Sequence, residues 1–214
     1  LDMSKKLNSK KGEAGSLCNL GIAYSMKGDL DKALSLYKES FHVFNQIDEY
    51  DAKANCLNNI SLIYSWQKKY GKAIDYSLQG YQIDNKYASQ NKLAKTSLNL
   101  SRIYYRMHDY TNSLKYALKA HEIGQQFKDA DGWYKQFIVD TYLHLASIYD
   151  TIGEYDIAVN NYKMGSDKYE LLHANDEERI AHNSADLGLA YYKLKDYKQA
   201  IEEFKSSLSF KNHS

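Results

Sequence analysis

The chain repeats one spacing of small and aromatic residues five times. A small residue comes three places before a tyrosine, and a second small residue follows twelve places after the first one. The first small residues of the five copies are Gly21, Ser61, Ser101, Ala146 and Gly188. Their positions, 21, 61, 101, 146 and 188, give intervals of 40, 40, 45 and 42 residues. Self-similarity at such a period predicts a solenoid built from one repeated supersecondary unit.

Each copy contains the pattern of two amphipathic helices. In the second copy, apolar or small residues recur every three or four places up to Tyr64, and the pattern restarts at Tyr70. This spacing is typical of one buried helix face. Because only a few residues separate the two patterns, the two helices are expected to be antiparallel neighbours. The sequence therefore predicts an all-α fold of five helix hairpins, with the small residues where helices cross.

Composition excludes several other classes. None of the 214 residues is proline, so long helices can run without interruption. Lys and Arg number 28 against 27 Asp and Glu, and a net charge of +1 gives no general attraction to nucleic acid. The sequence contains no run of 18 apolar residues, the length needed to span a membrane. Its first residues also lack the apolar stretch of a secretory signal. We expect a cytoplasmic location, with the periplasm as the alternative for a fragment of a membrane sensor.

The motifs of common enzymes are missing. The sequence has no glycine-rich phosphate loop, no spaced Cys/His zinc set and no serine in a nucleophile elbow. The cysteines, Cys18 and Cys56, lie at different phases of their helices, which favours reduced small apolar residues over a disulfide. We therefore expect a protein that is not an enzyme and that holds neither a cofactor nor a metal ion.

A family resemblance rests on motifs in the first and last copies. The first copy has Leu17, Leu20, Gly21 and Tyr24, followed by Gly28, Ala33 and Tyr37. The last copy has Leu187, Gly188 and Tyr191, followed by Tyr197, Ala200 and Phe204. Both resemble the tetratricopeptide repeat signature, which implies a right-handed α-α superhelix. The copies are longer than the usual period of about 34 residues and lack its proline. In length they are similar to repeats of kinesin light chains and of peptide-sensing bacterial signalling regulators.

The resemblance also suggests where each repeat begins and ends. The predicted repeats cover residues 13–49, 50–90, 91–128, 129–174 and 175–214. Residues 1–12 resemble the tail of a preceding second helix, because Lys11 and Gly12 follow residues 1–7 as Asp131 and Gly132 follow a similar segment at 120–127. The chain is thus expected to begin inside a repeat and to be part of a longer protein.

A row of polar residues is the sharpest functional signal. In this family the first helix of each hairpin lines the concave side. The residues two places before the five small residues are Asn19, Asn59, Asn99, His144 and Asp186. An asparagine amide carries donors and an acceptor, so a row of them can pair with the backbone of an extended peptide. The alternative is that each asparagine bonds a neighbouring helix and only ties repeats together.

Other positions on the same helix face would give specificity. The second and third copies supply Trp66, Lys95, Arg102, Tyr105 and Arg106. This basic and aromatic group is suited to a carboxylate or phosphate, although such charges on a helix are commonly just solvated. A full chaperone-type carboxylate clamp is not expected, because Cys18 and Ile22 stand where it needs Lys and Asn.

A metal site in the last two copies is geometrically conceivable. His182 and Asp186 are four places apart on one predicted helix, and His144 is expected to face them. Such residues more commonly form only hydrogen bonds, so we expect no bound metal here.

These observations favour a binding module. The leading interpretation is a scaffold that holds an extended peptide or partner segment in a concave groove, with no direct contact to nucleic acid. The alternative is a regulatory sensor segment of a histidine kinase or transcription regulator whose output domain lies outside this chain. A third interpretation is scaffolding through self-association of the terminal repeats.

Overall fold

A computed structural model describes residues 2–87, 90–127 and 133–210. Within these ranges the chain forms ten α-helices and no strand, which confirms the predicted all-α class. The helices belong to two compact units, Leu1–Met107 and His108–Ser214. Each unit is considered by itself.

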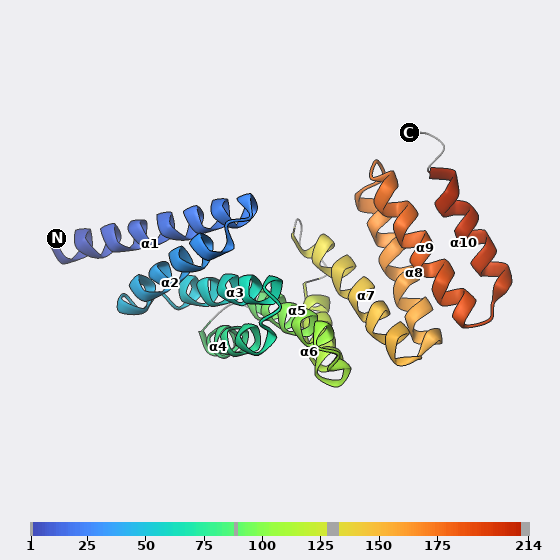
Figure 1. Cartoon of the computed structure of the whole chain (residues 1–214), viewed down its shortest axis with the longest axis horizontal. Helices are drawn as coiled ribbons and strands as arrows, with labels where there is room; N and C mark the ends of the chain where they lie inside the picture. Colours follow the sequence, from blue (N-terminus) through green and yellow to red (C-terminus); the bar gives the residue numbers. More distant parts are fainter. Residues whose placement is uncertain (1, 88–89, 128–132, 211–214) are drawn as a thin grey trace. The chain divides into compact units, whose positions relative to one another are not determined.

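The first unit contains the helices α1 to α5. Their bounds are Asp2–Lys27, Leu30–Gln46, Tyr50–Trp66, Tyr70–Tyr87 and Gln90–Arg106. Helices α1 and α2 form one antiparallel pair and α3 and α4 form the next, as Figure 1 shows. Helix α2 packs on α3, and α4 packs on α5. The apolar core of this unit gathers around Tyr37, Ile60 and Ile103, so it runs continuously from one hairpin to the next.

The second unit contains the helices α6 to α10. Their bounds are Tyr110–Gln125, Trp133–Ile152, Tyr155–Leu172, Glu177–Lys193 and Tyr197–Phe210. Here α7 pairs with α8 and α9 pairs with α10, while α6 packs on α7 and α8 on α9 (Figure 1). Ala146, Ala158 and Leu187 lie in its buried core. The small residues therefore occupy the helix crossings in this unit, as the spacing predicts.

The beginning of the chain differs from the expected boundary. Residues 2–12 do not end a separate helix, because α1 continues without a break from Asp2 to Lys27. The Ser16 hydroxyl donates to the Gly12 carbonyl at 2.9 Å, so Gly12 lies within a regular turn of the helix. A single glycine in a helix interior costs about 1 kcal/mol, which does not suffice to end a helix with favourable residues on both sides.

The turns within the hairpins share one construction. In each turn a residue with positive φ stands two places before the first residue of the second helix, and these residues are Gly28, Lys68, His108, Gly153 and Lys195. Asp29 and Asp109 then accept backbone N–H bonds from Lys32 and Asn112, each at 3.1 Å. A side-chain acceptor at this position satisfies one unpaired donor of the first helical turn. Asp29 and Asp109 are therefore the N-cap residues of α2 and α6.

Residue size is matched between the two helices of a hairpin. A Cβ atom at Gly21 would lie 2.8 Å from Cε1 of Tyr37, and one at Gly188 would lie 2.8 Å from Cε1 of Phe204. In each case the ring stands sixteen places after the glycine. At the same two phases of the sequence, the third copy has Ser101 and Ala117. The glycine therefore makes room for an aromatic ring from its own second helix.

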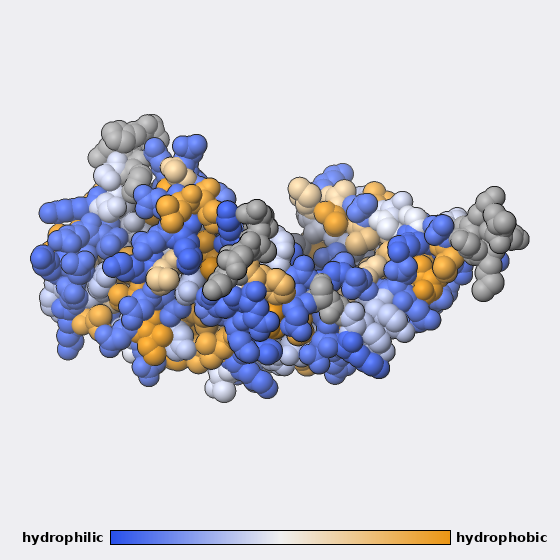
Figure 2. All heavy atoms as spheres, turned by 180° about the vertical axis from the view of Figure 1, so that it is seen from behind, coloured by the Kyte–Doolittle hydropathy of each residue, from blue (hydrophilic) through white to orange (hydrophobic). Residues whose placement is uncertain are grey.

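The surface is mixed in character. On the face shown in Figure 2, hydrophobic side chains lie in patches separated by hydrophilic ones. Across the described ranges, no helix has both the length and the apolar character needed to cross a bilayer.

Candidate functional site

Most of the predicted binding residues share one side of each first helix, where they are exposed or half-buried. We define the first-helix stripe as the residues six and two places before the small residue and one and five places after it. In α3 these are Asn55, Asn59, Leu62 and Trp66, and in α5 they are Lys95, Asn99, Arg102 and Arg106. The other faces of both helices are largely buried. The three-and-four spacing keeps each stripe on one side of its helix.

The three asparagines have different surroundings. Asn19 on α1 is exposed, whereas Asn59 on α3 and Asn99 on α5 are half-buried. The Asn59 Nδ2 donates to Sγ of Cys18 at 3.8 Å. Among the described side chains, the amides of Asn19 and Asn99 form no hydrogen bond with one another or with a neighbouring helix. The sequence left open that each asparagine only bonds a neighbouring helix. Among the described side chains of this row in the first unit, such a bond is formed by the amide of Asn59 alone.

Hydrogen bonds between first helices set the stripes of the first unit side by side. The Asn59–Cys18 contact joins α3 to α1, and Arg106 Nη1 donates to Ser65 Oγ at 2.8 Å, which joins α5 to α3. Ser65 is buried and precedes Trp66, whose side chain is 50% exposed. The guanidinium of Arg106 is therefore held next to the end of α3 where Trp66 projects. A positive charge and an indole can together receive a ligand group that is both anionic and apolar.

Positive charge gathers on the stripe of α5. Lys95, Arg102 and Arg106 are exposed there, and Tyr105 is half-buried beside them. The neighbouring stripes carry no charge, since α1 supplies Gly15, Asn19, Ile22 and Met26 and α3 supplies the neutral residues named above. The first unit thus combines one basic stripe with two neutral ones.

The second unit has a more acidic stripe. His144 and Asp140 of α7 are half-buried, as is Asp186 of α9. Burial raises the pKa of Asp186, and the charge of His182 opposes this shift. The His182 Nε2 and Asp186 Oδ2 atoms are 3.5 Å apart. Within the described ranges, no three His, Cys, Asp or Glu residues come close enough to hold a metal ion, so His144 does not complete a site with this pair.

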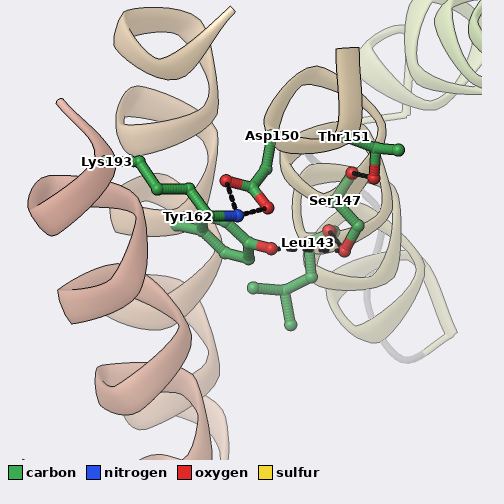
Figure 3. Close-up of polar contacts among 6 residues, drawn as sticks. All are labelled: Leu143, Ser147, Asp150, Thr151, Tyr162 and Lys193. Atoms are coloured by element: carbon green, nitrogen blue, oxygen red, sulfur yellow. Dashed lines mark hydrogen bonds and ion pairs between the residues drawn. The ribbon is translucent and has the colours of Figure 1, made fainter. Parts of the chain in front are cut away.

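Polar contacts also join neighbouring helices in the second unit (Figure 3). Lys193 of α9 donates to the two carboxylate oxygens of Asp150 on α7 at 2.8 and 2.5 Å. The Ser147 hydroxyl of α7 lies 3.5 Å from the Tyr162 hydroxyl of α8. Ser147 and Lys193 are stripe residues, so part of this face is engaged in holding α7, α8 and α9 together.

A second row of residues is buried between repeats, and sequence reasoning missed it. Five places before the small residue, four copies have Cys56, Thr96, Thr141 and Asn183, each at most 3% exposed. Thr96 accepts from Asn58 Nδ2 at 2.8 Å and donates to Asp84 Oδ2 at 2.6 Å, so it connects α3, α4 and α5. A signal was present in the sequence, because polar residues interrupt an otherwise apolar face at this phase.

The two cysteines are neighbours despite their different phases. Cys18 packs against the cluster that contains Cys56. The neighbouring Cys56 thiol, together with the Asn59 amide, outweighs burial and lowers the pKa of Cys18 to about 7. The Cys18 thiol and burial raise the pKa of Cys56. Both cysteines are free of disulfide bonds.

Solved structures with the same fold are similar over nearly the whole chain. BtubC from P. vanneervenii has a TM-score of 0.82 at 18% identity, covering 98% of this chain and 89% of its own. A putative kinesin light chain from Podosopora anserina has a TM-score of 0.76 at 14% identity, with 94% and 96% covered. A signal transduction ATPase with a tetratricopeptide repeat sensor, from Pyrococcus horikoshii, has 0.76 at 17% identity, with 91% and 30% covered. Identities this low establish the fold alone.

Sequence comparison identifies the repeat itself. No curated protein matches the chain by sequence. Tetratricopeptide repeat profiles match residues 12–86 and residues 139–163 and 182–213, which together are more than half of the chain. The matched ranges contain the motifs around Gly21 and Gly188 and the helix pairs described above. The chain therefore belongs to the tetratricopeptide repeat family.

Proposed function

We propose that the chain is a scaffold that binds an extended segment of a partner protein along the first-helix stripes of residues 1–107. The observation that carries this proposal is the row of Asn19, Asn59 and Asn99 at one phase of three neighbouring helices. The amides of Asn19 and Asn99 are not used for packing, and a hydrogen-bonding group left on a groove surface can pair with a peptide backbone.

The charges of the stripe indicate the kind of segment. Lys95, Arg102 and Arg106 carry positive charge on α5, and the exposed Trp66 follows Ser65, to which Arg106 donates. Charge-assisted hydrogen bonds to carboxylates are about twice as strong as neutral ones. We therefore expect the bound segment to be extended and acidic, with an apolar side chain near the carboxylate that meets Arg106.

The likeness to a structure with a tetratricopeptide repeat sensor supports a second candidate, in which the chain senses its ligand for a larger signalling protein. Both candidates require a ligand on the stripes. They differ in whether binding alters a domain outside these residues, and the full gene sequence distinguishes them. Self-association is a third candidate, favoured by the exposed apolar side chains of Tyr197, Ile201 and Leu208 on α10. It predicts a dimer in light scattering without added peptide.

The test is fluorescence polarisation with pools of acidic, neutral and basic peptides. Loss of one hydrogen bond costs about 0.5–1.5 kcal/mol, so Asn19→Ala and Asn99→Ala are each expected to weaken binding of the acidic pool roughly 2- to 10-fold. Asn45→Ala, an exposed asparagine on α2, is the matched control and leaves the affinity unchanged. If both stripe variants fold, as circular dichroism reports, and bind as the wild type does, the asparagine row plays no part in binding.

A second readout isolates the charges. Arg102→Gln should weaken binding of the acidic pool more than binding of the neutral pool. It should also reduce the salt dependence of binding, because exposed charges are screened by salt. Equal effects on both pools would mean that the stripe does not select for acidic segments.

A further inference from the structure

The contact between Cys18 and Cys56 follows from the stagger of neighbouring first helices. Cys18 stands three places before its small residue and Cys56 five places before the next one. Asn58 and Thr96 occupy the same two phases one repeat later, and their side chains meet at 2.8 Å. Residues at these two phases therefore face each other across successive repeats. The contact between α1 and α3 has two sulfur atoms at the positions where the contact between α3 and α5 has an amide and a hydroxyl.

The two sulfurs differ in access and in surroundings. Cys56 is fully buried beside Ser40, with 3.3 Å between the Ser40 Oγ and Cys56 Sγ atoms. Cys18 is half-buried and accepts from the Asn59 amide at 3.8 Å. A thiol that is partly exposed and receives hydrogen bonds is held nearer to its thiolate form, which is the nucleophile in sulfur chemistry. The lowered pKa of Cys18 and the raised pKa of Cys56 agree with this difference in surroundings.

We propose that Cys18 and Cys56 form a peroxide-reactive dithiol, in which Cys18 attacks the oxidant and Cys56 resolves the product to a disulfide that joins α1 to α3. This modification site goes beyond the proposed peptide binding and does not depend on it. Redox-sensing thiols combine thiolate character, access to solvent and a second cysteine within reach, and this pair has all three.

The reaction balances with hydrogen peroxide as the oxidant. The Cys18 thiolate attacks one peroxide oxygen, an S–O bond forms, the O–O bond breaks and hydroxide leaves. That hydroxide takes the proton of the Cys56 thiol and becomes water. The Cys56 sulfur then attacks the Cys18 sulfur, an S–S bond forms, the S–O bond breaks and a second hydroxide leaves, which solvent protonates. The two sulfurs lose two electrons and the peroxide is reduced to two waters.

Closing this bond also changes the repeat junction. An S–S bond is about 2.05 Å long, shorter than the van der Waals contact of two sulfur atoms, so the two side chains must move together between α1 and α3. The Cys18 sulfur also loses the negative charge to which Asn59 donates. Oxidation thus acts on the part of α3 that carries the second asparagine of the row.

The experiment treats the reduced full chain with hydrogen peroxide and maps its peptides by mass spectrometry without reduction. We expect a linked peptide pair containing Cys18 and Cys56, a fall in mass by two hydrogen atoms and the loss of both free thiols. Cys56→Ser should stop at a Cys18 sulfenic acid that dimedone traps, whereas Cys18→Ser should leave Cys56 unreacted. A covalent dimer, or peroxide consumption at equal rates in both variants, would overturn the proposal.

A measurement on the wild type covers the case in which a variant fails to fold. Iodoacetamide should alkylate Cys18 half-maximally near pH 7, while Cys56 stays protected in the folded chain. Equal alkylation of both cysteines, with the pH dependence of an ordinary exposed thiol, contradicts the assigned roles.

Discussion

The contact between α3 and α5 in the first unit and the contact between α7 and α9 in the second unit have different residues at equivalent positions. Between α3 and α5, Asn58, Thr96 and Asp84 form a buried chain of hydrogen bonds. At the two matching phases of the second unit stand Leu143 and Asn183. Leu143 packs against an apolar cluster, and the Asn183 Nδ2 is buried with no hydrogen-bond partner among the described residues.

This difference teaches that one phase can support two kinds of junction. A buried chain of hydrogen bonds specifies which side chains meet, but loss of one partner leaves further groups unpaired. In this chain Asn58 Oδ1 and Asp84 Oδ1 already lack a hydrogen-bond partner among the described residues. An apolar junction tolerates change more evenly, because its contacts are not directional. We therefore expect substitutions at the same phase to have opposite signs in the two units.

The largest effect is expected for Thr96→Val, which keeps the shape of the side chain and removes its hydroxyl. The Asn58 amide and an Asp84 oxygen then lose their partner in a buried site, which costs about 1–3 kcal/mol. Urea unfolding followed by circular dichroism measures this loss. Ser97→Ala is the control, since the buried Ser97 hydroxyl donates to the Leu93 carbonyl of its own helix at 2.6 Å. A loss as large in the control would show that the buried chain is not special.

A change of opposite sign is expected for Asn183→Leu in the second unit. Leucine resembles asparagine in shape, and it removes an amide nitrogen that is buried without a partner. The free energy of unfolding should rise by about 1 kcal/mol, because an unpaired buried donor is destabilising. The companion Asn58→Leu should lower it. The same sign for both variants would break the comparison between the units.

The smallest effect concerns pH and sharpens the role of Asp84. Burial raises the pKa of Asp84, while the Thr96 hydrogen bond and the charge of Lys92 oppose the shift. An unfolded aspartate titrates near about 3.9, so between that pH and the higher folded pKa the native state binds more protons than the unfolded state. Stability should therefore fall as the pH rises through this window and then level off.

Asp84→Asn provides the reference for that measurement. The variant lacks the ionisable group, so the difference in unfolding free energy between it and the wild type should change across the window and be constant above it. A difference that is independent of pH would mean that Asp84 titrates alike in the folded and unfolded chains.

Much of the fold could be predicted from the sequence because phase along a helix is a local property. The spacing around Ser61 and Tyr64 predicted one buried helix face, and these residues are buried in α3. The continuous helix through Gly12 could not be predicted in this way. The similarity to another segment suggested a turn there, but the local hydrogen bonds favour the helix.

The candidate site was predictable only in part, for a related reason. The stripe positions of Asn19, Asn59 and Asn99 depend on phase alone, so they follow from the spacing of the small residues. Contacts between helices depend also on how far one helix is shifted along its neighbour, which large packed side chains decide. The sequence alone therefore separated Cys18 from Cys56, although the stagger seen at Asn58 and Thr96 brings such positions together.

The size match between each glycine and its aromatic partner bears on how such a chain could be rebuilt or duplicated. The space at Gly21 is filled by Tyr37, and the space at Gly188 by Phe204. A chimera that combined the first helix of the third copy with the second helix of the first would set the Ser101 side chain against the Tyr37 ring. Exchanging whole hairpins keeps each pair intact. The transferable module of this protein is therefore the hairpin, and a single helix carries only half of the fit.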